Sequence, residues 1–282
     1  MLGHRLMLHL ADEFDVVGTV RRLPAWLDRR PAERNRPIAT NIDATDLAGL
    51  AAFLDDHKPD VVLNCIGIVK QLAEARDPIK SIEINALFPH LLARLCADRG
   101  ARLIHFSTDC VFAGTGGPYR QDAVSDARDL YGRSKYLGEV GEMQNALTIR
   151  SSIIGHEFDN KTGLMEWILT QKGRTASGFA QALYTGVTTI EMAKTVERLI
   201  KEFPSMWGVW QFSSPQINKF DLVRLVNEVY SLGIDVRRDD EFFCDRRLDG
   251  TLFERETGIV SGSWDEMVRA QYEIYLSEYK NG

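Results

Sequence analysis

The chain has 282 residues, enough for one large α/β domain or for one domain and a smaller second one. Its composition, 44% hydrophobic and 26% charged, is ordinary for a soluble globular protein, and no apolar run reaches the roughly 18 residues of a membrane span. The net charge of −6 argues against a nucleic-acid surface, and four widely spaced cysteines without a secretion signal favour the cytoplasm and give no metal site.

A helix is predicted over residues 1–10, because its apolar residues recur with helical spacing, and we expect that apolar face to be buried. Short runs rich in Val, Ile and Leu then predict strands. These are residues 15–20, 38–42, 60–68, 101–107 and 146–154. Nearly continuous apolar runs are typical of strands covered on both faces, as in a parallel sheet.

Helices are predicted between these strands, over residues 45–57, 77–100 and 131–143, with Gly100 as a glycine just past a helix end. Residues 21–37, rich in Arg and Pro, read as a surface connection. Alternating strands and helices imply right-handed crossovers. The predicted fold class is therefore α/β, a doubly wound, Rossmann-type parallel sheet.

The pattern changes after about residue 155. Helices are predicted over residues 163–173, 188–203, 218–233 and 263–279, and a strand over residues 208–214. We therefore expect residues 1–155 to form the doubly wound domain. Residues 156–282 would form mostly a smaller, helix-rich cap, interleaved with the last strands of the sheet.

Ligands of open parallel sheets lie beyond the carboxyl ends of the strands. There the chain places Arg21, Asp43, residues 64–67, residues 107–109 and residues 150–152.

Tyr131 and Lys135 share one face of a predicted helix, four residues apart. A nearby ammonium lowers the pKa of a tyrosine, which can then exchange a proton with a substrate oxygen near neutral pH. A hydroxyl at the preceding strand end, in Ser107-Thr108-Asp109, can hold that oxygen. The Tyr–Lys pair alone also arises by chance, but the stretch around it is far rarer.

The stretches "STDCVFAG", "YGRSKYLGE", "LTIRSS" and "DRRLDGTLFERETG" carry a resemblance that spans nearly the whole chain. The chain resembles the extended short-chain dehydrogenase/reductases, in the branch of the dTDP-4-dehydrorhamnose reductases. The resemblance implies that Tyr131 is the proton donor and that Lys135 binds the nicotinamide ribose. It also implies that Thr108 orients the substrate carbonyl, a role for which Ser107 is second choice.

The resemblance further implies a function. Residues 1–155 would bind NADP(H), and the protein would reduce a nucleotide-linked 4-keto-6-deoxy sugar for deoxysugar and polysaccharide biosynthesis. Its binding partner would be the nucleotide sugar, and neither nucleic acid nor a membrane is expected as a partner. A homodimer is left as a possibility. The alternatives are a sugar-nucleotide epimerase or dehydratase using NAD, and a non-catalytic NADP-binding regulatory subunit.

Members of this family begin with a strand and a glycine-rich turn, and "MLGHRL" resembles the tail of that motif, with Gly3 as its third glycine. The first strand and two glycines are absent. Because that strand is central, its loss would leave two neighbours without a hydrogen-bonding partner. We expect a start codon assigned too far downstream. The alternative is a degenerate protein that no longer binds cofactor.

Arginine after the second strand suits the 2′-phosphate of NADPH, whereas NAD enzymes usually offer an acidic residue there. Asp43 resembles the family's acidic residue near the adenine, while Thr45 or Asp46 caps the next helix. The expected cofactor-binding residues are Gly3, Arg21, Arg22, Asp43, Asn64, Ile66, Gly67, Ser107, Tyr131 and Lys135. Arg22 also fits a solvated surface arginine, and Asn85 a buried structural amide.

The expected substrate-binding residues are Asp109, Cys110, Arg150, Ser152, Ile153, Arg246 and Arg247. Paired guanidinium groups such as Arg246 and Arg247 suit a nucleotide diphosphate. Cys110 and Ile153 replace the family's usual tyrosine and tryptophan, which leaves the exact sugar open. The six histidines share no metal-like spacing and are interpreted as structural or surface residues.

Overall fold

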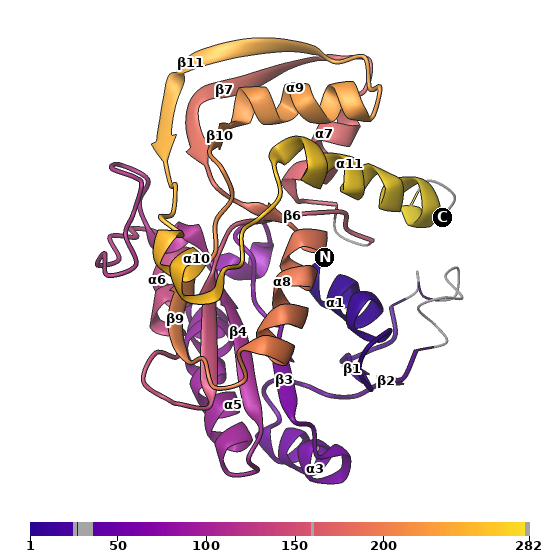
Figure 1. Ribbon diagram of the computed structural model, residues 1–282, viewed down its shortest axis with the longest axis vertical. Helices are drawn as coiled ribbons and strands as arrows, with labels where there is room; N and C mark the ends of the chain where they lie inside the picture. Colours follow the sequence, from indigo (N-terminus) through magenta and orange to yellow (C-terminus); the bar gives the residue numbers. More distant parts are fainter. Residues whose placement is uncertain (25–26, 28–35, 159–160, 280–282) are drawn as a thin grey trace.

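A computed structural model of the chain describes residues 1–24, 27, 36–158 and 161–279 (Figure 1). Its helices are α1 (Leu2–Leu10), α3 (Leu47–His57), α4 (Pro78–Ser81), α5 (Phe88–Ala97), α6 (Leu130–Leu137), α7 (Leu164–Thr170), α8 (Thr189–Glu202), α9 (Lys219–Val229), α10 (Thr251–Thr257) and α11 (Trp264–Ile274). Shorter helical turns are η2 (Ala73–Arg76), η3 (Ile82–Leu87), η4 (Asp109–Val111) and η5 (Tyr275–Tyr279).

The strands are β1 (Gly18–Thr19), β2 (Ile38–Ala39), β3 (Val61–Asn64), β4 (Arg102–Ser107), β5 (Ala146–Arg150), β6 (Ile153–Ile154), β7 (Thr175–Tyr184), β8 (Val187–Thr188), β9 (Gly208–Gln211), β10 (Ile217–Asn218) and β11 (Asp235–Asp245). The predicted run 146–154 divides into β5 and β6, which belong to different sheets. Part of the predicted surface loop 21–37 lies outside the described residues.

The main sheet is parallel, in the order β3-β4-β5-β9, which confirms the predicted fold class. Alternate residues of β4 enter two different cores. Leu103 packs with residues of α3 and α5, whereas Ile104 and Phe106 pack with residues of α1 and α8. Both faces of the sheet are therefore covered, which is why β4 and β5 carry nearly unbroken apolar runs. No helix in the described part of the chain is long and apolar enough to cross a membrane.

The N-terminal helix α1 is buried as predicted, with Leu6 and Leu10 in the core beside α8. Next to it the sheet is divided. Strands β1 and β2 form a separate parallel pair, and within the described residues β1 pairs only with β2 and β3 only with β4. Within the described residues no strand pairing therefore joins the β1-β2 pair to the main sheet.

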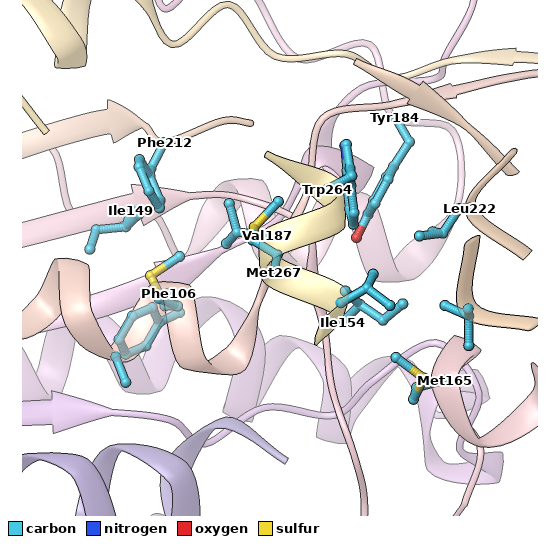
Figure 2. Close-up of a cluster of buried hydrophobic side chains, with 14 of the residues drawn as sticks. Phe106, Ile149, Ile154, Met165, Tyr184, Val187, Phe212, Leu222, Trp264 and Met267 are labelled. Atoms are coloured by element: carbon cyan, nitrogen blue, oxygen red, sulfur yellow. The ribbon is translucent and has the colours of Figure 1, made fainter. Parts of the chain in front are cut away.

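A second sheet, in the order β10-β7-β11, forms the other end of the molecule (Figure 1). Helix α9 packs against it, and Tyr184, Leu222 and Trp264 meet in the core beneath (Figure 2). Its two long strands, β7 and β11, did not emerge from the sequence. β7 alternates between exposed and buried residues, and β11 is charged and mostly exposed, so neither has an apolar run.

Candidate active site

The end of β4 continues into η4, and this junction carries the predicted threonine. The Thr108 side chain accepts a hydrogen bond from the Cys110 backbone N–H (3.1 Å) and its hydroxyl donates to Asp109 Oδ1 (3.1 Å). Thr108 and Asp109 are both buried. The hydroxyl is thus held at the carboxyl end of a central strand, where ligands of such sheets bind.

Tyr131 reaches the same place from the first turn of α6. Asp129 caps this helix by accepting a hydrogen bond from the Gly132 N–H (2.8 Å). A Cβ at position 132 would lie 2.2 Å from the Cys110 carbonyl oxygen, so only glycine lets α6 lie this close to η4. The approach places the Tyr131 phenol close enough to Thr108 for the threonine side chain to act on the pKa of Tyr131. Two of the three predicted catalytic residues therefore meet.

Lys135 lies one turn further along α6 and is buried. Its Nζ donates to the Phe106 carbonyl oxygen (2.7 Å) and lies 3.4 Å from His105 Nε2. Burial lowers the pKa of Lys135 to about 8. Burial also raises the pKa of Tyr131, and the neighbouring Cys110 adds to this, although Thr108 acts in the opposite direction.

The direction of the Tyr131 shift is opposite to the one predicted from the Tyr–Lys spacing. A phenolate removed from water is costly, and the Lys135 Nζ is directed to the Phe106 carbonyl oxygen. Tyr131 is therefore a neutral phenol that carries its proton.

His105 and Asn64 continue inward from Lys135. Asn64 Nδ2 lies 3.1 Å from His105 Nδ1, and Asn64 Oδ1 accepts a hydrogen bond from the Ile66 N–H (3.1 Å). Asn85, interpreted as a structural amide, bonds both backbone groups of Ile68 and the Ser134 hydroxyl. Sequence reasoning missed His105, although a histidine within the apolar run "LIHFS" was a signal that its ring is buried.

The expected cofactor residues outside β4 and α6 lie at or after the ends of the strands β1, β2 and β3, apart from Gly3 at the start of α1. A Cβ on Gly3 would lie 3.3 Å from Cys65 Cβ, so the start of α1 packs directly against the segment after β3. The charge of Arg21 acts on Asp43, whose Oδ1 accepts two hydrogen bonds from Thr45 that lower the pKa of Asp43. Asp46, rather than Thr45, caps α3. Arg22 is exposed.

Two residues from the expected set are engaged elsewhere. Arg150 and Glu139 form a buried, two-pronged ion pair (Nε–Oε1 2.7 Å, Nη2–Oε2 2.7 Å), and the Ser107 hydroxyl donates to the same carboxylate (2.6 Å). The remaining Arg150 nitrogen donates to the Gln121 carbonyl oxygen (3.2 Å). Arg150 and Ser107 thus hold β4, β5 and the end of α6 together, and their polar atoms face one another rather than a ligand.

The two cap arginines differ. Arg247 binds Asp245 with two nitrogens (2.8 and 2.6 Å) and is committed to that carboxylate. Arg246 donates to the Phe112 carbonyl oxygen (2.9 Å), and its Nη1 lies 3.9 Å from Cys110 Sγ, which places it beside the site.

The expected pair after β5, Ser152 and Ile153, lies at the junction between β5 and β6. Ile153 lies in β6, paired with Val187, and packs on the hydrophobic core, because β6 leaves the main sheet. The Ser152 carbonyl oxygen accepts a hydrogen bond from the Val187 N–H (2.8 Å).

Lys219, which sequence reasoning missed, lies on the same side of the site as Arg246 and belongs to the expected substrate-binding cap. It begins α9, and its Nζ lies 3.6 Å from the centre of the Tyr184 ring. Burial lowers the pKa of Lys219 to about 8, and the charge of Asp109 acts against that shift. One lysine after a short strand gives no sequence signal, because only the folded cap carries it to Asp109.

These groups face one another from two directions. The main sheet and α6 present a neutral phenol, a threonine hydroxyl and a buried lysine, and the cap presents the cations Lys219 and Arg246. Such a site can protonate an oxygen atom and hold an anion. Within the described residues no group of three or more His, Cys, Asp or Glu side chains is arranged to hold a metal ion.

Comparison with known proteins gives consistent results. The family model "RmlD substrate binding domain" matches residues 1–231. A dTDP-4-keto-6-deoxy-D-glucose reductase of Streptomyces niveus is 26% identical over 246 residues, 82% of this chain and 83% of the relative. The methionine adenosyltransferase 2 subunit beta of Xenopus laevis is 27% identical over 71% of this chain and 63% of its own length.

Among solved structures, a dTDP-4-dehydrorhamnose reductase of Bacillus anthracis in complex with NADP superimposes with a TM-score of 0.74 at 18% identity. The superposition covers 91% of this chain and 98% of the Bacillus anthracis chain. This likeness supports the fold. Because the family model covers most of the chain, the chain belongs to the RmlD substrate binding domain family, within the extended short-chain dehydrogenase/reductases that its motifs resemble.

Proposed function

We propose that the protein is an NADPH-dependent reductase of a nucleotide-linked 4-keto-6-deoxy sugar, acting in deoxysugar and polysaccharide biosynthesis. The observation that carries this proposal is that Tyr131 lies near enough to Thr108, at the end of β4, for Thr108 to act on its pKa, with buried Lys135 one helical turn away. A proton donor next to a hydroxyl, at the ligand-binding edge of a parallel sheet, suits protonation of a carbonyl oxygen. The named relative that reduces a keto sugar supports the substrate class.

The roles of the chain's own residues follow from their surroundings. Thr108 holds the carbonyl oxygen, and Tyr131, kept protonated by burial, transfers its proton to that oxygen as negative charge develops there. Lys135 stabilises the resulting phenolate by its positive charge, which it carries below pH of about 8. NADPH, when bound, supplies the hydride.

The residues near β1 and β3 fit the cofactor in part. Arg21, beside Asp43, suits a 2′-phosphate, and Gly3 lets the start of α1 pack closely on Cys65 after β3. NADP in the Bacillus anthracis structure supports the choice of cofactor. Residues 1–155 would form this binding domain, and most of 156–282 the substrate cap.

The nucleotide diphosphate would lie on the cap side. Lys219 and Arg246 provide positive charge there, whereas Arg247 and Arg150 are committed to carboxylates. Cys110 lies beside Arg246 and near Tyr131, so we expect it to contact the sugar. We expect the reaction to take place in the cytoplasm, and a homodimer remains compatible with it.

A second function is favoured by one observation. A regulatory subunit, the methionine adenosyltransferase 2 subunit beta of Xenopus laevis, is among the relatives. A non-catalytic, NADP-binding role is therefore the alternative.

The test is to incubate the purified protein with NADPH or NADH and a panel of nucleotide-linked 4-keto-6-deoxy sugars, following nicotinamide absorbance and sugar products. Net oxidation of NADPH with one of the sugars is expected. Epimerised product without net oxidation would indicate an NAD-dependent epimerase. Binding of NADPH without turnover over the whole panel would favour the regulatory role and overturn the reductase.

A further inference from the structure

A line of three buried polar side chains runs inward from the site, and the proposed reaction uses only the first. Lys135 on α6, His105 on β4 and Asn64 on β3 are 6%, 0% and 2% exposed. Asn64 and His105 are opposite each other in the sheet register. Buried polar groups of this kind must satisfy one another, so their hydrogen-bond pattern fixes where protons lie.

The orientation of the Asn64 amide is fixed from outside. A backbone N–H can only donate, and the Ile66 N–H faces Asn64 Oδ1 at 3.1 Å. The Asn64 NH2 group is therefore the one that faces His105 Nδ1, also at 3.1 Å. Because this NH2 group donates, Nδ1 accepts with its lone pair. A neutral imidazole then carries its proton on Nε2.

That Nε2–H faces Lys135 Nζ, 3.4 Å away. An ammonium has three N–H bonds and no lone pair, so it would place one donor against another. A neutral amine can accept the Nε2–H with its lone pair while one of its N–H bonds donates to the Phe106 carbonyl oxygen. The other N–H stays available to a ligand. The arrangement therefore stabilises the amine relative to the ammonium, which lowers the pH at which Lys135 loses its proton.

We propose that His105 is a positioning residue: held by Asn64 as the Nε2–H tautomer, it donates to Lys135 and so makes that lysine ready to release its proton near neutral pH. The charge state of Lys135 is a property of the chain alone, and only its effect on turnover rests on the proposed reductase function.

The other charged groups around the pair act as follows. Burial is the largest influence on both, lowering the pKa of His105 and of Lys135, and Lys135 and His90 lower that of His105 further. Glu139, beyond the end of α6, favours the ammonium, but it is itself paired with Arg150. His105 is therefore neutral throughout the range in which Lys135 titrates.

The first measurement uses the unaltered protein. Nitrogen-15 chemical shifts of labelled histidine report which ring nitrogen carries the proton, and the ε-carbon shift of labelled lysine, assigned with Lys135→Arg, reports the titration of Lys135. We expect His105 as the Nε2–H tautomer and a Lys135 midpoint near 8. An Nδ1–H tautomer for His105 would overturn the proposal.

Two variants test the cause. In Asn64→Asp a carboxylate still accepts from Ile66 and attracts a proton to His105 Nδ1, so Nε2 becomes an acceptor for the ammonium. In His105→Gln an amide oxygen can take the place of Nε2–H. In either variant the Lys135 midpoint should rise by about one pH unit or more. His57→Gln, the same replacement at an exposed histidine, should leave it unchanged.

An unchanged Lys135 midpoint in Asn64→Asp would overturn the proposal even if His105→Gln does not fold. The upper limb of the pH–turnover profile should rise with the same midpoint, provided the protein is a reductase. If no turnover is found, the resonance titrations still decide the role of His105, so failure of the reductase function and failure of this proposal give different results.

Discussion

The two sides of the candidate site are built differently. On the sheet side, Thr108, Lys135, His105 and the Glu139–Arg150 pair are buried, and each has its hydrogen-bonding partner within the main sheet or α6. On the cap side, Lys219 and Arg246 are half-buried and contact an aromatic ring and carbonyl oxygens. Groups fixed in advance suit the chemical step, whereas cations without carboxylate partners of their own suit capture of an anionic ligand.

The sharpest test of the sheet side is Tyr131→Phe. Loss of the phenolic proton donor should reduce turnover by about 10²- to 10⁴-fold, while NADPH binding and folding persist. Tyr136→Phe on the same helix is the matched control, because that side chain is 38% exposed. Steady-state rates and cofactor titration measure both. Equal rates in the two variants would remove Tyr131 from the mechanism.

The structural part of the sheet side should respond in stability. Glu139→Gln leaves the buried Arg150 guanidinium without its carboxylate, which should lower the free energy of unfolding by about 3–5 kcal/mol in urea denaturation. Glu202→Gln breaks the pair with Arg198, whose side chains are 42% and 45% exposed, and should cost about 0.5 kcal/mol or less. Similar losses of unfolding free energy in Glu139→Gln and Glu202→Gln would contradict the buried, structural role of the Glu139–Arg150 pair.

The cap side should respond in affinity instead. Lys219→Met removes one positive charge but keeps the length of the side chain, and should raise KM for the nucleotide sugar roughly 10- to 100-fold with little change in kcat. Lys172→Met, at an exposed position, is the control. A fall in kcat with unchanged KM would place Lys219 in the chemical step.

The smallest expected effect is a pH dependence. Burial holds the pKa of Lys219 near 8, so its charge is present below that pH and is lost above it. Affinity for a nucleoside diphosphate, measured by calorimetry, should therefore fall several-fold, roughly threefold to tenfold, from pH of about 7.5 to 9.5. Lys219→Met should show a flat profile. A slope retained in that variant would assign the titration to another group.

Local patterns in the sequence were sufficient for much of the fold. Apolar runs identified β4 and β5, helical spacing identified α1 and α8, and together they gave the parallel sheet. The four-residue spacing of Tyr131 and Lys135 identified the helix face nearest the site. Predictions from these patterns are correct because both faces of the sheet are buried, so that its strands are continuous runs of hydrophobic residues in the sequence.

The second sheet, β10-β7-β11, could not be predicted from the sequence in this way. β11 carries eleven residues of mostly exposed, charged sequence and becomes a strand by pairing with β7, whose partner residues lie some sixty positions earlier in the chain. The strand conformation of β11 depends on its pairing with β7, and the residues close to β11 in the sequence give no information about that partner strand.

The same division holds for the site. The sequence by itself determined the candidate acid, Tyr131, and the strand end that meets it, because both depend on neighbours in the chain. Only the tertiary structure decided that Arg150 belongs to Glu139, that Lys219 reaches the site and that His105 lies against Lys135. Charge state and availability depend on burial and on partners from distant segments, and folding alone brings those together.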